Sequence, residues 1–247
     1  MAAAVLAAAL TGCSATPAPP RPAPAPPRPT ATSASTTAPG PNDPAQELAQ
    51  LRAALAAAQQ PFSAILSVQV TDGTLDVRRQ GAINVAPDAQ TGALGVVSVQ
   101  QDARTQTYLT VTRDAAWTRT EDRPWTRSPR PAQPLLVDHR PLAQALLRAD
   151  PGSFHGMAKI RTLHGGTGFH LVGRLPVAQL ADALDADSRA HLAEHQVPDC
   201  ATDLLIDDAG RLSELTLSCE AGGYAFRSTT GLAEFGPVAE TPPPADL

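Results

Sequence analysis

A pair of histidines near residue 190 has the spacing of a zinc-protease motif. The stretch His191-Leu192-Ala193-Glu194-His195 reads His-x-x-Glu-His, and on a helix the two histidines would share one face and bind zinc. Glu194 would then act as the general base. A third protein ligand is required, but the following carboxylates fall in expected strands: Glu214, Glu220 and Glu234. We therefore expect no metal site, and interpret the motif as a solvated helix end.

Two glycine-rich stretches contain groups used by esterases. The run His164-Gly165-Gly166-Thr167-Gly168 is similar to an oxyanion-hole loop, but no Gly-x-Ser-x-Gly nucleophile motif occurs in the chain. Ser153 and His155 lie two residues apart, a spacing that rarely assembles a charge-relay geometry. Turn formation explains both stretches. With no dinucleotide or phosphate-loop motif either, we expect a protein that is not an enzyme and has no cofactor.

Two of the three cysteines are spaced for a cross-strand disulfide. The stretch Asp207-Asp208-Ala209-Gly210-Arg211 reads as a turn. If residues 208–211 form a four-residue loop, the register that sets Asp207 opposite Leu212 also sets Cys200 opposite Cys219. Opposed residues in a non-hydrogen-bonded pair lie about 4.5 Å apart at Cα, within disulfide reach. A disulfide suits an exported protein; the alternative is two buried thiols.

The third cysteine, Cys13, ends a short apolar run. Residues 2–10 have the form of a signal-peptide hydrophobic region and are too few to span a bilayer. The tetrad Leu10-Thr11-Gly12-Cys13 matches the bacterial lipobox. Resemblance to bacterial lipoproteins implies that residues 1–12 are a signal peptide. It also implies that Cys13 becomes the mature N-terminus and carries a lipid with palmitate-type acyl chains. Because no Lys or Arg precedes the run, the true start is expected slightly upstream.

A proline-rich segment follows Cys13. It has 11 prolines in the 31 residues from Ser14 to Pro44, and no aromatic or large aliphatic residue. Such a segment cannot bury enough apolar area to offset the entropy of ordering, and proline keeps it extended. We therefore expect residues 13–43 to be a disordered, lipid-anchored linker, 44–240 a folded domain, and 241–247 a flexible tail.

Composition narrows the choice of partners. The chain of 247 residues has 19 Lys and Arg against 24 Asp and Glu, a formal net charge of -5. No basic stripe is visible, so affinity for nucleic acid should be weak. The sequence also lacks an apolar run long enough for a membrane span. The partners expected are a membrane, through the lipid anchor, and a lipid or glycolipid ligand; the sequence identifies no protein partner.

The hydrophobic period switches from helical to extended after Pro61. Asp43 and Pro44 predict the start of a helix that Pro61 ends. Alternation then predicts a meander of antiparallel strands. The strands are expected at 62–70, 75–85, 94–99, 107–112, 116–120, 125–127, 201–206, 212–219 and 224–230, with a hairpin in 162–175. Helices are expected at 141–148, 176–184 and 188–195.

Trp117 and Trp125 flank the turn Asp122-Arg123-Pro124. We interpret them as cross-strand packing residues that fix a hairpin. The alternative is an aromatic pair that binds a sugar or a lipid.

Three further stretches carry a family resemblance. They are "YLTVTRDAAWTRTEDRPWTR", "LLIDDAGRLSELTLS" and "LAEFGPVAETPPPA". In this order, after a lipobox and linker, they resemble the LolA-like lipoproteins of actinobacteria, of the LppX and LprG type. The resemblance covers roughly residues 44 to 244, although Cys200 stands where many relatives have an aromatic or aliphatic residue. It implies an α+β fold, a half-open antiparallel β-barrel whose curved sheet packs on a few helices.

The resemblance also implies a function. The family's concave side can hold acyl chains, so we expect a lipoprotein on the extracytoplasmic face of the cell membrane that binds or carries a lipid. Alternating strands predict an apolar row for this purpose: Leu66, Val68, Val70, Ile83, Val85, Val97, Val99, Leu109 and Val111. The alternative is a non-enzymatic structural or signalling module with a filled core that acts through a protein partner. A closed interior with a large exposed apolar patch would favour the alternative.

Overall fold

The computed structural model describes residues 43–73, 75–101, 103–160 and 166–245. Cys13, the expected signal peptide 1–12 and the linker up to residue 42 lie outside the described residues. So do His164 and Gly165 of the glycine-rich stretch and the last two residues of the expected tail. No described helix has the length and apolarity that a membrane crossing requires.

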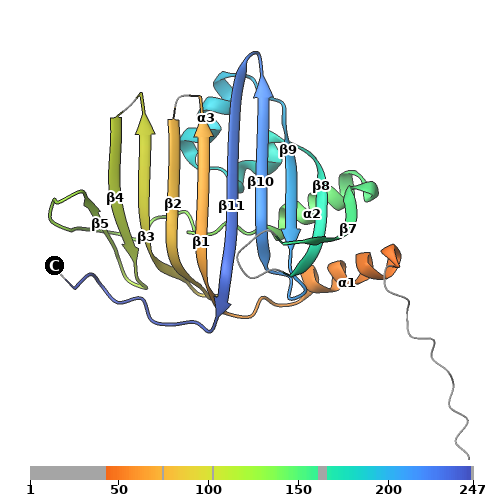
Figure 1. The fold of residues 1–247 in the computed structure, drawn as a ribbon, viewed down its shortest axis with the longest axis horizontal. Helices are drawn as coiled ribbons and strands as arrows, with labels where there is room; N and C mark the ends of the chain where they lie inside the picture. The colour runs from red at the N-terminus through yellow and green to blue at the C-terminus, as the bar shows by residue number, and fades with distance from the viewer. Residues whose placement is uncertain (1–42, 74, 102, 161–165, 246–247) are drawn as a thin grey trace, which may run out of the picture. The chain divides into compact units, whose positions relative to one another are not determined.

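Eleven antiparallel strands form one curved sheet that does not close (Figure 1). They are β1 Phe62–Asp72, β2 Leu75–Val85, β3 Gln90–Gln100, β4 Ala103–Val111, β5 Ala116–Thr120, β6 Thr126–Ser128, β7 Phe154–Lys159, β8 Thr167–Pro176, β9 Asp199–Ile206, β10 Leu212–Ala221 and β11 Tyr224–Gly236. Their order is β6-β5-β4-β3-β2-β1-β11-β10-β9-β8-β7. The chain starts at the centre, runs out to one edge, crosses to the other edge and returns. The predicted fold class is confirmed.

Short helices accompany the sheet. They are α1 Pro44–Ala56, α2 Arg140–Ala149 and α3 Ala186–Glu194, with 3₁₀ turns η1 Pro151–Ser153 and η2 Val177–Ala183. Asp43 caps α1 by accepting a hydrogen bond from the Ala45 amide at 3.0 Å, as its residue type favours. The 3₁₀ form of η2 differs from the α-helix expected at 176–184, and the first strand of the expected hairpin lies earlier, at Phe154–Lys159.

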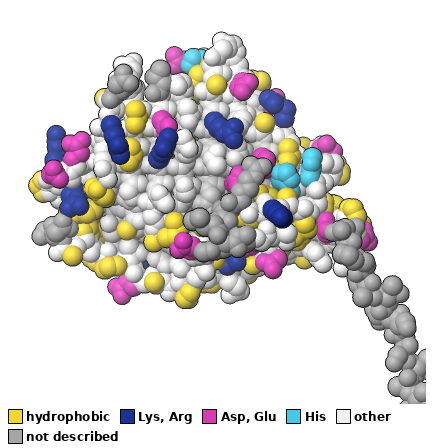
Figure 2. Space-filling view, in the orientation of Figure 1, with side chains coloured by type: hydrophobic (Ala, Val, Ile, Leu, Met, Phe, Trp, Pro, Cys, Tyr) yellow, Lys and Arg dark blue, Asp and Glu magenta, His cyan; other side chains and the backbone are white. Residues whose placement is uncertain are grey.

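The two faces of the sheet differ in polarity. Along β1, burial alternates, and the buried members Phe62, Ala64, Leu66 and Val70 share one face. We call this the inward face, because the same alternation in β9, β10 and β11 directs Leu204, Leu217 and Phe226 into a common core. Figure 2 shows Lys and Arg side chains spread across a face of the molecule, with hydrophobic atoms in separate groups.

The helices cover only one half of the inward face. In Figure 1 they overlap β1 and β7 to β11, whereas β3 to β5 carry none. The contacts agree, since α1 packs on β7 and both α2 and η2 pack on β8. The leucines of these helices are buried in the core: Leu51, Leu55, Leu142, Leu146, Leu180 and Leu192. This half therefore has a conventional filled interior.

An irregular segment, residues 129–139, crosses from β6 toward α2 and is called the crossing segment below. Leu136 is its one residue in the hydrophobic core, 5% exposed. The Gln90 side chain holds Leu136 from both sides, donating to its carbonyl at 2.9 Å and accepting from its amide at 2.8 Å. Arg130 donates to the Gln90 carbonyl at 2.9 Å. The crossing segment is thus fixed to the start of β3.

A close approach of β2 and β3 bends this part of the sheet. A Cβ on Gly81 would lie 2.0 Å from the carbonyl oxygen of Ala93, so only glycine fits there. On the outer surface, Thr241 hydrogen-bonds Asn84 and Thr91, each at 3.0 Å. This residue, which the sequence assigns to the tail, is therefore bound to the sheet.

The hairpin of β5 and β6 is held by cation–π contacts, as we expected of a packing role for its tryptophans. Arg119 lies 4.8 Å from the Trp125 ring and 5.1 Å from the Tyr108 ring. Arg127 lies over Trp117 at 5.9 Å, and Trp117 is only 8% exposed. These rings stabilise the edge of the sheet.

Candidate functional site

The residues expected to contact a lipid lie on both faces of the sheet. Strand register places seven of them on the inward face: Leu66, Val68, Val70, Ile83, Val85, Leu109 and Val111. Val97 and Val99 lie on the outward face, because they pair with the outward-facing Arg78 and Asp76. The expectation that Val97 and Val99 face the concave side with the others is therefore corrected, and β3 contributes Leu94 and Val96 to the inward face instead.

Most of the seven inward-facing residues are already packed. Leu66, Val70, Ile83, Val85 and Val111 are each less than 9% exposed. Val68 and Leu109 are half-buried instead. Val68 is flanked along its strand by two buried residues, so its exposure marks a gap in the packing of the interior.

A small cavity, called the central cavity here, accounts for that gap. Its sheet side is formed by Val68, Val70, Arg79, Phe226, Ser228 and Thr230. Gln133 and residues 135–137 of the crossing segment, residues 182–185 and Ser188 close the other side. The cavity volume is about 90 Å³, below the roughly 300–1,000 Å³ of ordinary ligand pockets. It has room for about three water-sized groups, and an acyl chain would require it to widen.

The two covers of the central cavity are attached with different strength. On the helical side, Leu180, Leu184 and Leu192 are at most 4% exposed and fix η2 and α3 to the sheet. The crossing segment contributes Leu136 to the core and makes three hydrogen bonds with Gln90, two involving Leu136 and one involving Arg130. Burial of one leucine is worth roughly 1.5–3 kcal/mol and each hydrogen bond roughly 0.5–1.5 kcal/mol. The crossing segment is therefore the cover that costs less to displace.

A charged side chain lies beside the apolar wall of the central cavity. Arg79 is inward-facing in β2, and its cross-strand neighbours are Val68 in β1 and Val96 in β3. Its guanidinium lies 3.8 Å from the Asp185 carboxylate. Asp185 also caps α3, accepting from the Ser188 amide at 2.8 Å.

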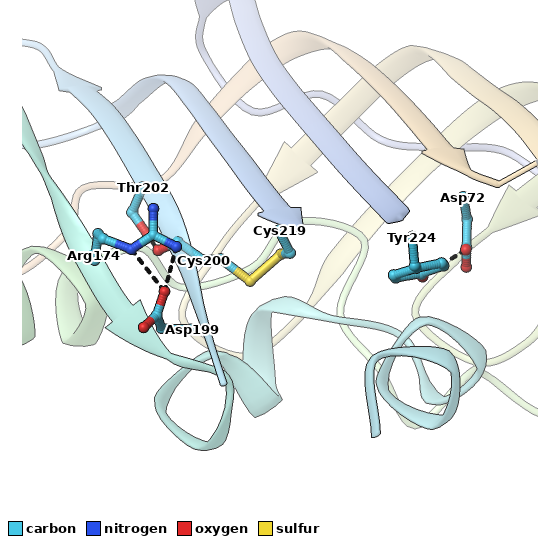
Figure 3. Close-up of a disulfide and its surroundings, with 7 residues drawn as sticks. All are labelled: Asp72, Arg174, Asp199, Cys200, Thr202, Cys219 and Tyr224. Atoms are coloured by element: carbon cyan, nitrogen blue, oxygen red, sulfur yellow. Dashed lines mark hydrogen bonds and ion pairs between the residues drawn. A yellow bond between two sulfur atoms is a disulfide. The ribbon is translucent and has the colours of Figure 1, made fainter. Parts of the chain in front are cut away.

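The two histidines of the zinc-like motif both contact the end of the sheet. His191 in α3 is hydrogen-bonded through Nδ1 to the Asp72 carboxylate at 2.7 Å, and the Tyr224 hydroxyl donates to the same carboxylate at 2.6 Å. The His195 ring stacks on the Tyr224 ring with centroids 4.0 Å apart. Figure 3 shows Tyr224 pointing toward Asp72. These contacts attach the end of α3 to β1 and β11.

Charge is concentrated at this attachment. The hydrogen bond to Asp72 raises the pKa of His191, and the charge of Asp72 adds to that effect. Burial raises the pKa of the Tyr224 hydroxyl, as does its hydrogen bond to Asp72. Asp72 is 8% exposed, so its carboxylate relies on these two partners.

The described residues do not assemble a zinc centre around His191. Within the part of the chain that the structure describes, no three His, Cys, Asp or Glu side chains are arranged to hold a metal ion. Ser153 and His155 do not form a nucleophile pair either. The Ser153 hydroxyl is buried with no hydrogen-bond partner among the described residues, whereas His155 packs against the His170 ring with centroids 5.6 Å apart.

Cys200 and Cys219 form a disulfide between β9 and β10, with their Cα atoms 4.3 Å apart (Figure 3). The predicted cross-strand pair is confirmed. The turn differs in detail, because Leu212 pairs with Ile206 and a bulge at Ser213 restores the expected register. Both cysteines are fully buried beside Leu175 and Phe226. The disulfide therefore belongs to the filled half of the sheet.

Some residues at the cavity were not found from the sequence. Arg79 follows Arg78 directly, and nothing in that pair of letters says which one faces inward. Leu136 lies in a stretch without a hydrophobic period. No sequence pattern around Gln90 predicts that its side chain contacts this stretch. The Asp72-Gly73 turn was expected, but the contacts of Asp72 with α3 join residues more than a hundred positions apart in the chain.

Fold and site together define a class: an open, curved antiparallel sheet with short helices over half of its inward face and a small cavity of mixed lining where that cover ends. No protein-family model matches the chain, and no curated protein does. Among solved structures the chain is similar to the Mycobacterium tuberculosis lipoprotein LppX, with 13% identity over 81% of this chain and 100% of that one, at a TM-score of 0.41.

Two further solved structures are similar at TM-scores of 0.22 and 9% identity. A putative outer membrane lipoprotein-sorting protein domain from Vibrio parahaemolyticus aligns over 78% of this chain and 93% of its own. A β-barrel-like protein of a domain of unknown function from Brucella abortus aligns over 72% and 98%. Similarity at this level says nothing of a shared ligand.

Proposed function

We propose that the protein is a membrane-anchored, extracytoplasmic lipoprotein that binds a lipid or another amphiphile against the inward face of its sheet. The observation that carries the proposal is the central cavity, a gap of mixed apolar and polar lining in the interior at the place where the helical cover ends. The Leu-Thr-Gly-Cys pattern at Cys13 and the proline-rich segment after it support the anchor. The solved structures named as a lipoprotein and as a lipoprotein-sorting domain are consistent with this class.

Energetics favour a ligand that displaces the crossing segment. Release of Leu136, its two hydrogen bonds to Gln90 and the hydrogen bond from Arg130 to the Gln90 carbonyl costs on the order of 4–9 kcal/mol. Burial of an acyl chain gains about 0.8 kcal/mol per methylene, so a chain of about 16 carbons offers more than that cost. Short apolar molecules would not compensate for opening. The proposal therefore requires a long-chain ligand.

Native mass spectrometry tests the binding. The protein is purified from its own host without detergent and examined intact, and the proposal expects a bound species of lipid mass that organic extraction removes. Recovery of ligand-free protein only, under conditions that retain the disulfide, would count against it.

Replacement of Cys13 by Ser tests the anchor. The variant should be released into the medium or remain uncleaved, whereas the unsubstituted chain should fractionate with membranes. Normal processing and membrane retention of the variant would overturn the anchoring proposal and leave the lipid-binding proposal in place.

The small volume of the central cavity favours a second candidate, a filled-core module that acts through a protein partner. The outer surface of the molecule argues against this second candidate. Among the described residues the large hydrophobic side chains that stand exposed are Met157 and Val238, on different elements, and neither makes a continuous patch of the kind that marks a protein interface.

A further inference from the structure

Arg79 is the charged side chain in the middle of the inward face. Along β2, Arg78 faces outward and forms an ion pair with Asp76 at 3.1 Å, whereas Arg79 faces the interior. The Arg79 side chain is 43% exposed, and its neighbours on the inward face, Val68, Val77 and Val96, are half-buried. A charge between two valines breaks the apolar pattern of the strand, and such departures gather at functional sites.

The guanidinium of Arg79 interacts only weakly with other groups of the protein. Its ion-pair distance to Asp185 is 3.8 Å, too long for a hydrogen bond, and Asp185 is engaged in capping α3. The structure shows no hydrogen bond from Arg79 within the residues it describes. Five N–H donors are thus available at the rim of the central cavity.

Polar hydroxyls surround the same rim. Ser188 lies on the helical cover, while Ser228 and Thr230 are inward-facing in β11. The apolar wall continues past them through Val68, Val70 and Phe226. Groups that suit an oxygen-rich headgroup therefore lie directly beside side chains that suit a hydrocarbon chain, with Arg79 and Thr230 on either side of Val68.

We infer that the ligand is an amphiphile with one anionic headgroup, a carboxylate or a phosphodiester, held by Arg79 while its chain lies along the inward face. This rests on the proposed function. A guanidinium binds carboxylate and phosphate oxygens in a bidentate arrangement that neutral headgroups cannot match. Asp182 and Asp185 also line the cavity, so a doubly charged phosphate monoester is disfavoured by repulsion.

The test compares three probes on the full chain carrying Cys13→Ser. They are a fluorescent 16-carbon fatty acid, its methyl ester and the corresponding monoalkyl phosphate, each titrated at pH 7 in low salt. The unsubstituted inward face should bind the acid at least about tenfold more tightly than the ester, because hydrogen bonds to charged groups are worth roughly 1.5–3 kcal/mol. The phosphate monoester should bind more weakly than the acid.

Arg79→Met and Arg78→Met form a matched pair of neighbouring substitutions on opposite faces. Arg79→Met should weaken binding of the acid about 10- to 100-fold and leave binding of the ester within about threefold. Arg78→Met should change neither. Thermal melting of each variant confirms that it is folded, and Arg79→Lys should recover part of the affinity, because it keeps the charge but not the bidentate geometry.

The outcomes separate this inference from the proposed function. If acid and ester bind equally well, or if Arg79→Met binds the acid normally, the anionic headgroup is wrong while lipid binding stands. If the unsubstituted chain binds none of the probes and yields no co-purified lipid, the proposed function fails and the inference fails with it.

Discussion

The two halves of the sheet differ in how their inward-facing side chains are buried. In the half formed by β7 to β11, the inward-facing leucines are completely buried, as with Leu171, Leu204 and Leu217, each at most 1% exposed. In the half formed by β2 to β5, inward-facing residues at one end of the strands, such as Ile83 and Val111, are buried, whereas those toward the other end, such as Val77, Val96 and Thr107, are half-buried. Helices cover the first half, and one irregular segment crosses the second.

The difference separates stability from binding. A face filled by leucines from both sides has no space to give to a ligand. A face of valine and threonine under a cover fixed by one buried leucine and three hydrogen bonds to Gln90 can exchange that cover for another apolar group. The central cavity and Arg79 lie where the two halves meet, which is where a ligand gains burial without dismantling the core.

Leucine truncation should show the contrast most strongly. Leu204→Ala in the covered half should reduce the free energy of unfolding by about 2–5 kcal/mol, because it leaves a cavity in a tightly packed region. Val96→Ala in the other half should cost less than about 1 kcal/mol. Denaturant unfolding measures both, and equal costs would contradict the division into two halves.

Loss of the disulfide should come next in size. Cys200→Ser together with Cys219→Ser removes a link across a sequence separation of 19 residues, worth about 3 kcal/mol in the chain-entropy model. Unfolding of the double variant and of the unsubstituted protein under non-reducing conditions gives the difference. Because the disulfide lies in the covered half, affinity for an acyl probe should remain unchanged, and a large loss of affinity would contradict the account.

His139 should make stability depend on pH. It is 2% exposed and bonded through Nε2 to the Gly210 carbonyl at 3.0 Å. Burial lowers its pKa, with partly opposing effects from that hydrogen bond and from Asp138 and Asp207. The unfolded chain then binds the proton more readily, so its stabilising contribution is present above about pH 6.5 and is lost as pH falls through the folded-state pKa. His139→Gln should flatten that part of a curve of unfolding free energy against pH.

His191 should give a smaller effect of opposite sign. Its raised pKa means that the folded protein holds the proton more tightly, so the contribution of the Asp72 pair is fully present below about pH 6.5 and fades as pH rises through the raised value. The side chain is 47% exposed, which limits the contribution to under about 1 kcal/mol. His191→Gln should remove this term and leave the acid-side loss due to His139.

The sequence predicted strands in both halves, but it predicted which residues face inward better in the covered half than in the other. Strong alternation in residues 62–70, 201–206 and 212–219 indicated strands, and the turn at residues 207–211 was enough to pair Cys200 with Cys219, since hairpin register is a local property. The strand Phe154–Lys159 was missed because it is short, lies at an edge and contains Gly156.

In the other half the pattern was ambiguous. Val96 and Val97 are adjacent, so the sequence alone could not decide which of them faces inward, and a shift of one residue reverses every side chain. The position of Leu136 against Gln90 depends on a contact 46 residues apart. No local pattern encodes it.

Two matched tryptophan substitutions test the central claim, that a ligand occupies the inward face at the central cavity. Val68→Trp places an indole in the cavity, whereas Val97→Trp places one on the outward face of a nearby strand. We predict that Val68→Trp abolishes binding of a fluorescent fatty acid while melting near the unsubstituted protein, and that Val97→Trp binds normally. If Val68→Trp instead loses about 1–3 kcal/mol of stability and the unsubstituted protein binds no fatty acid, the interior is a filled core and the account is wrong.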